Sequence, residues 1–201
     1  IGDLNSYVSC QRDILTGRVR TRLRTEGGMH CEEEPPRGSF ELIPPVYIGR
    51  NVRIGAAAVV GPFAVLDDGC QVGNSARIKG SVLLPSSYAG DRSSLSGALL
   101  CHGASVHRGA SLFEGAAVGA DSTVGDHSTV RPGVKIWPEK RVEAGTILSD
   151  HLRSGRGTPT LFDDNGVTGE TGVELTPELC ARFGAAVGSL SRGERIAVGC
   201  S

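Results

Sequence analysis

Residues 100–148 read LCHGASVHRGASLFEGAAVGADSTVGDHSTVRPGVKIWPEKRVEAGTIL. Every sixth residue of this stretch is a branched aliphatic: Leu100, Val106, Leu112, Val118, Val124, Val130, Ile136, Val142 and Leu148. An earlier series has the same spacing: Ile48, Ile54, Val60, Leu66, Val72, Ile78 and Leu84. A period of six fits neither an α-helix, with 3.6 residues per turn, nor an amphipathic strand, with a period of two. It fits a short strand followed by a tight turn.

A second register supports this interpretation. The residue four positions after each aliphatic is usually small: Ala58, Ala64, Cys70, Ala76, Ala104, Ala110, Ala116, Ser122 and Ser128. Three repeats complete one coil of a triangular solenoid, so each aliphatic stacks on its equivalent in the next coil, about 4.8 Å away. A larger residue at the small position would overpack the interior. We therefore predict an all-β parallel solenoid over residues 45–149, with almost no helix over residues 48–148.

The prediction names particular stacks. Among the inward residues we expect four to be buried: Ile54, Val72, Val118 and Val130. One stack is expected to contain Ile48, Leu66 and Leu84. The two series are 16 residues apart between Leu84 and Leu100, which is not a multiple of six. We expect residues 85–94 to interrupt the repeat, either as an excursion from one corner or as a shortened coil. Such insertions lie on the outside and often bind partners, although a solvated loop is the simpler interpretation.

Composition excludes several classes of protein. The chain carries 21 Lys and Arg against 22 Asp and Glu, so bulk charge gives no reason to bind nucleic acid or an anionic membrane. No apolar run approaches the roughly 18 residues that span a bilayer. The six cysteines form no CxxC pair, which favours reduced thiols in the cytoplasm over a disulfide framework or a zinc site. Because residue 1 is Ile, we expect the sequence to start inside a longer polypeptide.

The flanks of the repeat divide into four segments. Residues 1–17 have apolar side chains at helical spacing, and Gly17 is a suitable end for the helix. Residues 18–44 and 150–160 are predicted to be linkers, and the His30–Cys31 pair beside three glutamates is interpreted as solvated linker rather than a metal site. Residues 161–201 read as the truncated start of an α/β domain, with a helix from Thr176-Pro177 and a strand over residues 194–199. Trp137 is interpreted as part of a cover over the last coil.

Several passages together resemble one family. Residues 133–140 (GVKIWPEK), followed by EAG at 143–145, resemble the solenoid end of sugar-1-phosphate nucleotidyltransferases, in particular the mannose-1-phosphate guanylyltransferase group fused to a phosphohexomutase-like domain. Residues 1–4 (IGDL) and 12–17 (RDILTG) resemble the exit from the catalytic domain of that family. The start of a phosphoglucomutase/phosphomannomutase domain is resembled by three motifs: residues 166–169 (GVTG), 175–179 (LTPEL) and 184–188 (GAAVG).

The resemblance implies a left-handed parallel β-helix of hexapeptide repeats, and a function in sugar-nucleotide synthesis. The whole enzyme would transfer a nucleotidyl group from GTP to mannose 1-phosphate with the help of Mg²⁺, and the solenoid would act as a spacer, an oligomerisation surface or a regulatory module. Residues 1–17 would be the helical exit of a nucleotidyltransferase domain absent from this chain, and residues 161–201 the start of the phosphohexomutase-like domain. Thr168 and the Gly199-Cys200-Ser201 end depart from the mutase pattern. No catalytic, cofactor-binding or metal-ligating residue carries over to this chain.

Two other functions remain open. A hexapeptide acyltransferase uses a histidine as general base, but His102, His107 and His127 lie at different offsets from the preceding aliphatic residue. A purely structural interaction solenoid is the third possibility. Cys70 and Cys101 are interpreted as packing or surface thiols rather than nucleophiles. For partners, we expect a homo-oligomer formed through the solenoid, together with the missing catalytic domains, and neither nucleic acid nor membrane.

Overall fold

The computed structural model describes residues 3–19, 28–33, 38–155, 167 and 175–190. The chain divides into two units, residues 1–160 and 161–201. The first unit is a left-handed parallel β-helix with one helix, α1 (Leu4–Leu15), and the second contains α2 (Pro177–Leu190). Within the described part of the chain, neither helix is long and apolar enough to cross a membrane.

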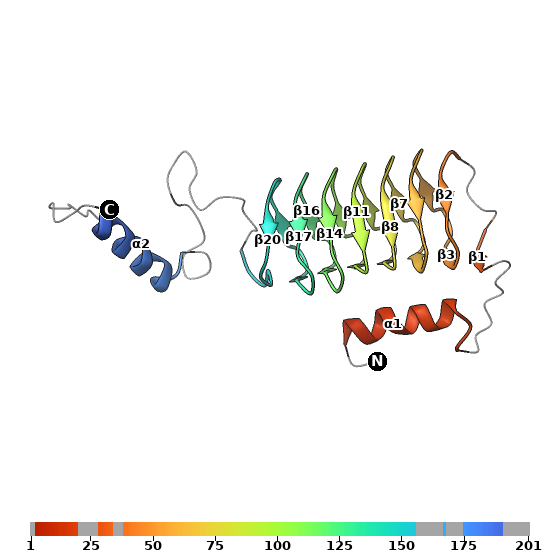
Figure 1. Cartoon of the computed structure of the whole chain (residues 1–201), viewed down its shortest axis with the longest axis horizontal. Helices are drawn as coiled ribbons and strands as arrows, with labels where there is room; N and C mark the ends of the chain where they lie inside the picture. Colours follow the sequence, from red (N-terminus) through yellow and green to blue (C-terminus); the bar gives the residue numbers. More distant parts are fainter. Residues whose placement is uncertain (1–2, 20–27, 34–37, 156–166, 168–174, 191–201) are drawn as a thin grey trace. The chain divides into compact units, whose positions relative to one another are not determined.

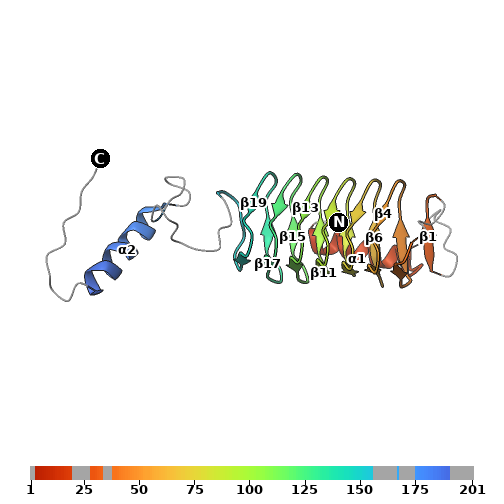
Figure 2. The same ribbon diagram turned by 90° about the horizontal axis from the view of Figure 1, so that it is seen from above.

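The β-helix has three parallel sheets, one for each side of the coil, and its coils stack along one axis (Figures 1 and 2). Sheet A consists of β1 (Met29–Cys31), β3 (Val46–Ile48), β6 (Ala64–Leu66), β9 (Val82–Leu83), β12 (Leu99–Leu100), β15 (Ala117–Val118) and β18 (Lys135–Ile136). Sheet B consists of β2 (Glu41–Leu42), β5 (Val59–Val60), β8 (Arg77–Lys79), β11 (Ser94–Ser96), β14 (Ser111–Leu112), β17 (Thr129–Val130) and β20 (Ile147–Leu148). Sheet C consists of β4 (Arg53–Ile54), β7 (Gln71–Val72), β10 (Tyr88–Ala89), β13 (Ser105–Val106), β16 (Thr123–Val124) and β19 (Arg141–Val142).

The six-residue series forms the core, as predicted. Val118 and Val130 are completely buried and Val72 is 4% exposed, while residues 48–148 contain no helix. The small residues at the second register, among them Ala58, Ala76 and Ala104, are also fully buried. Ile54 was predicted to be buried but is only partly so, because β4 is the edge strand of sheet C. An edge strand has a neighbouring coil on one side only.

The interruption between the two series is a pair of shortened coils. Leu66 pairs with Leu83, and Leu83 pairs with Leu100, so the register advances by 17 residues twice before it returns to 18 at Val118. The prediction that Leu84 belongs to this stack is wrong: Leu83 points inward, and Leu84 packs on the outside. The alternative of an external excursion over residues 85–94 is also wrong, since these residues contain β10 and its turns, in regular register.

Both missing residues come from the same corner, the turn from sheet B to sheet A, which we call the B–A turn. Gly80 and Gly97 occupy equivalent positions there in the left-handed region, with φ of 58° and 64°. Ser81, completely buried, closes the shortened turn: its hydroxyl donates to the Lys79 carbonyl (2.9 Å) and accepts the Ala98 N–H (3.0 Å). A side-chain hydroxyl thus satisfies backbone groups beside the place where one residue is missing.

The N-terminal flank is more structured than a linker would be. Asp3 caps α1 by accepting the Ser6 N–H at 2.7 Å. The helix lies alongside the β-helix and runs in the direction of coil stacking (Figures 1 and 2). Within residues 18–44, which were predicted as a linker, β1 and β2 join the first coil by pairing with β3 and β5. The linker prediction therefore missed two strands.

At the other end of the β-helix, Leu152 pairs with Ile136 and is 8% exposed. The Trp137 N–H donates to the Leu152 carbonyl (2.9 Å), and the Trp137 ring supports the Arg153 guanidinium, 5.0 Å from the ring centroid. Trp137 is itself 38% exposed, so it supports the terminal segment rather than acting alone as a cover.

In the second unit, Thr176 caps α2 by accepting the Leu179 N–H at 3.3 Å. The predicted helix from Thr176-Pro177 is therefore present. The strand predicted over residues 194–199 lies outside the described residues.

Candidate functional site

The outer face of sheet A differs from that of the other two sheets because it is apolar. Four consecutive strands, β6, β9, β12 and β15, each present one buried apolar residue outward: Val65, Val82, Leu99 and Ala117. We call these four residues the sheet A ladder. The same outward position in sheets B and C is mostly polar or charged: Arg77, Ser94, Ser111 and Thr129 in sheet B, and Arg53, Gln71, Ser105, Thr123 and Arg141 in sheet C.

Helix α1 covers the sheet A ladder. Leu15 is buried against it, and Tyr7 and Val8 are partly buried in the same cluster. Arg12 lies over the Phe63 ring, 5.3 Å from its centroid, and holds the helix beside the B–A turn. Near the start of the helix the ladder residue is Ala117, whose side chain is small. A cavity of about 340 Å³ lies there between α1 and the β-helix. The helix is therefore attached to the side of the solenoid by apolar packing.

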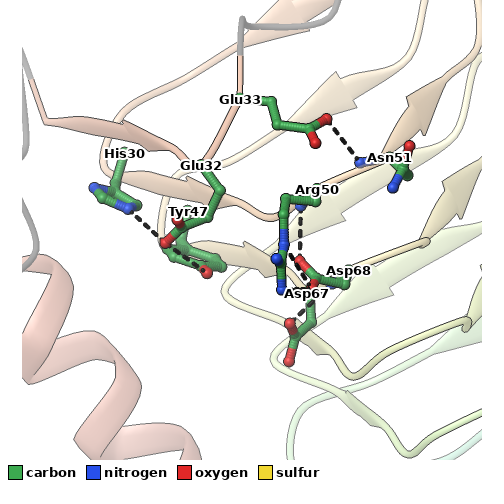
Figure 3. A network of polar contacts seen from close by, with 8 residues as sticks. All are labelled: His30, Glu32, Glu33, Tyr47, Arg50, Asn51, Asp67 and Asp68. Carbon is green, nitrogen blue, oxygen red and sulfur yellow. Dashed lines mark hydrogen bonds and ion pairs between the residues drawn. The ribbon is translucent and has the colours of Figure 1, made fainter.

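A polar network fixes the first coil (Figure 3). One oxygen of Glu32 interacts with His30 Nε2 at 3.0 Å and accepts the Tyr47 hydroxyl at 3.2 Å, while the His30 and Tyr47 rings stack 5.2 Å apart. The hydrogen bond to His30 lowers the pKa of Glu32, with a further contribution from Tyr47. Burial, together with the nearby Glu32 charge, raises the pKa of Tyr47 to about 12. These contacts tie β1 and the residue that follows it to β3.

A second part of this network links the next two turns. Arg50 donates from Nε and Nη2 to Asp68 Oδ2 (3.1 and 2.7 Å), and its backbone N–H donates to Asp68 Oδ1 at 2.7 Å. This bond pattern lowers the pKa of Asp68. The Asn51 N–H donates to Glu33 Oε2 (3.2 Å). Among the described residues no group of three or more His, Cys, Asp or Glu could hold a metal ion. Because its ion pair and hydrogen bonds join consecutive turns, we call this network the clasp of the first coil.

The three histidines considered as acyltransferase bases lie on the surface and do not converge. His102 is in the turn from sheet A to sheet C, whereas His107 and His127 are in the turn from sheet C to sheet B, one coil apart. His127 lies over Gly109, where an added Cβ would be 2.6 Å from its Nδ1. His107 Nδ1 is 3.8 Å from Asp126 Oδ1, and its ring is edge-on to Tyr88 at 6.5 Å.

Cys70 and Cys101 are packing thiols. Cys70 is fully buried, and its Sγ lies 3.3 Å from the Leu84 carbonyl and 3.4 Å from Ser87 Oγ. Burial raises the pKa of both Cys70 and Cys101, which lowers the thiolate fraction that a nucleophile needs. Cys101 belongs to the cluster under α1.

A model of the GMPPB C-terminal domain matches residues 42–151, more than half of the chain and almost the whole β-helix. The chain belongs to the GMPPB C-terminal domain family. The bifunctional protein GlmU of Nitrosospira multiformis is 30% identical over 112 residues, which are 49% of this chain and 24% of that protein. The chain thus spans about a quarter of that relative. The β-helix of this chain is thus that of a sugar-1-phosphate nucleotidyltransferase family.

The solved structures that match this member of the GMPPB C-terminal domain family do so at low identity and low TM-score. The acetyltransferase domain of PglB from Neisseria gonorrhoeae has 17% identity and a TM-score of 0.39, over 76% of this chain and 64% of that one. UDP-N-acetylglucosamine acyltransferase from Campylobacter jejuni has 12% identity and a TM-score of 0.36, over 79% and 85% of the two chains.

Proposed function

We propose that this chain is the assembly module of an enzyme that transfers a nucleotidyl group from GTP to mannose 1-phosphate and releases pyrophosphate in the cytoplasm. The family match over residues 42–151 supports the proposal. The resemblance of residues 12–17 to the exit from a nucleotidyltransferase domain and of residues 175–179 to the start of a phosphohexomutase-like domain supports it further. Positioning and Mg²⁺ would supply most of the catalysis in the domain that holds the nucleotide.

The observation that carries the proposal is the packing of α1 on sheet A. Tyr7, Val8 and Leu15 hold the helix against four consecutive strands. Because the sheet A ladder is apolar, undocking the helix would expose it to water, at a cost of about 25 cal/mol for each Å² of apolar surface. A catalytic domain joined to α1 would therefore keep a defined position relative to the β-helix. A spacer or assembly module requires that rigidity.

We propose that the β-helix also joins copies of the protein. Two exposed apolar side chains lie on or beside sheet B: Ile147, 64% exposed on β20, and Phe113, 45% exposed directly after β14. Exposed apolar side chains of this size are common ingredients of contact surfaces. Among the described residues, β19 and β20 are the end strands of sheets C and B, and such edge strands can pair with another chain.

Light scattering over a range of micromolar concentrations tests the assembly. We expect a mass that is a multiple of 20.9 kDa and that falls on dilution. The double variant Phe113→Ser, Ile147→Ser should shift the population toward the monomer, whereas Val19→Ser, which removes a 43% exposed apolar side chain away from the sheets, should not. A constant mass of 20.9 kDa for the unmodified chain would show that the β-helix is only a spacer.

Activity assays test the non-catalytic role. The chain should release no pyrophosphate from GTP and mannose 1-phosphate in the presence of Mg²⁺. It should also transfer no acetyl group from acetyl-CoA. Pyrophosphate release that a point substitution within residues 1–201 abolishes would contradict the assignment. Acetyl transfer lost in His107→Ala would favour the acyltransferase interpretation instead.

A further inference from the structure

The outer face of sheet C holds a groove that the assembly role does not use. It has a volume of about 530 Å³ and lies on the last coils, over β16 and β19. Its lining combines His107, Thr123, Gly125, Asp126, Arg141 and Glu143 with the edge formed by Val142 and Ala144. Sheet A is covered by α1, so this groove is on a different side of the coil from the helix.

The register of the coils explains why the groove exists. His107, Gly125 and Glu143 occupy equivalent positions on three successive coils, directly after the inward residues Val106, Val124 and Val142. His107 and Glu143 are therefore two coil spacings apart, roughly 10 Å. Gly125 between them has no side chain and cannot accept one, because a Cβ there would be 2.6 Å from the Ala144 nitrogen. Between His107 and Glu143 the lining of this row is therefore backbone alone, and Gly125 forms the floor of the groove.

Polar groups of two kinds face this floor from opposite sides. Thr123 and Arg141 lie on one wall as neighbours in the outward row of sheet C. Asp126 lies on the other wall, where its Oδ1 accepts the Arg108 N–H at 3.1 Å and approaches His107 Nδ1 at 3.8 Å. Within the described part of the chain, neither the Arg141 guanidinium nor the Glu143 carboxylate has an ion-pair partner within 4.0 Å.

We propose that the groove binds a neutral pyranose. Adjacent ring hydroxyls can donate to the carboxylates of Asp126 and Glu143 and accept from the guanidinium of Arg141, which offers a planar fork of donors. Thr123 adds a hydroxyl that can donate or accept. The two carboxylates and the one guanidinium together carry a net charge of −1, so a phosphate group is disfavoured beside them. The exposed Tyr88 ring, edge-on to His107, extends the same surface with an apolar side for the sugar ring.

Saturation-transfer difference NMR with D-mannose tests the site. We expect signals from the ring protons, and a titration should show affinity about tenfold or more weaker in Arg141→Gln and in Glu143→Gln, because each variant removes hydrogen bonds to a charged group. Arg53→Gln is the matched control: Arg53 occupies the same outward row of sheet C, at its opposite end. This variant should bind D-mannose as the unmodified chain does, and all three variants should keep the circular dichroism spectrum of the parent.

Three results would overturn the proposal. One is the absence of a saturation-transfer signal for D-mannose, D-glucose and D-galactose alike. Another is an equal loss of affinity in Arg53→Gln, which would indicate a nonspecific surface effect. The third is tighter binding of mannose 1-phosphate than of mannose, because a groove of net negative charge should weaken the phosphorylated sugar. None of these results bears on oligomeric mass, so the assembly role is tested separately.

Discussion

Replacing Leu99 with Ala tests whether α1 covers sheet A. Leu99 points outward from β12, yet it is only 2% exposed because the helix lies over it. The substitution removes about three buried carbon groups at about 0.8 kcal/mol each and enlarges the neighbouring cavity, so we expect a loss of about 2–3 kcal/mol in the free energy of unfolding. Without the helix, the same residue would be exposed and the change would be within about 0.5 kcal/mol.

The assay is equilibrium urea unfolding followed by far-ultraviolet circular dichroism, with the midpoint compared at unchanged slope. Val19→Ala is the control, because Val19 is also a branched aliphatic but is 43% exposed and belongs to no strand. Hydrogen exchange of the α1 amides provides a local readout in case unfolding is not two-state. Equal midpoints for Leu99→Ala and Val19→Ala, with unchanged exchange in α1, would refute the covered-face arrangement.

Four further predictions concern the coil and its clasp. Val118→Asp should unfold the β-helix, since an unpaired carboxylate in the core costs several kcal/mol, and circular dichroism at neutral pH will show it. Ser81→Ala should lower stability by about 1–3 kcal/mol in urea unfolding, because the buried Ala98 N–H loses its acceptor; Ser111→Ala, on an outward position, should be near neutral. Because the pKa of Glu32 is lowered in the folded protein, its carboxylate contributes stability that is present above the ordinary pKa of 4.5 and is lost as pH falls through the lowered pKa. Glu32→Gln should therefore reduce the loss of stability on the acid side of a stability–pH profile. An unchanged acid side would rule out this contribution. In the alkaline direction, Tyr47 should ionise near pH 12 rather than 10 in a tyrosinate absorbance titration, and Glu32→Gln should lower that value.

The core of this fold could be predicted from periodicity because the interior of a β-helix repeats one environment many times. Where the six-residue period fails, it predicts the wrong inward residue. Leu83 and Leu84 are both aliphatic, so the six-residue series continues through Leu84 although the coil has lost a residue beforehand. Only the pairing of Leu66 with Leu83 reveals that the turn is short. The six-residue pattern does not identify Ser81 as the residue whose hydroxyl closes this turn.

The covered face left a signal that the six-residue pattern does not use. The residue before each inward aliphatic is polar in most strands of sheets B and C, but it is Tyr47, Val65, Val82, Leu99 and Ala117 along sheet A. Strands that are apolar on both faces indicate a second packing layer. Successive members of this row are 18, 17, 17 and 18 residues apart, so a search that allows both spacings would have found it. β1 and β2 had no such signal, since two or three residues become strands only by pairing with the first full coil.

The direction of α1 has a mechanical consequence. In a solenoid each coil contacts only its neighbours, so unfolding can proceed one coil at a time, as a zipper opens. A helix laid across β6, β9, β12 and β15 splints four coils together, and none of them can open without breaking contacts with the splint. The strands beyond it, from β16 to β20, lack that reinforcement from α1. Under a pulling force applied along the stack, the last coils should therefore peel away first, and the splinted coils should rupture later in a single step.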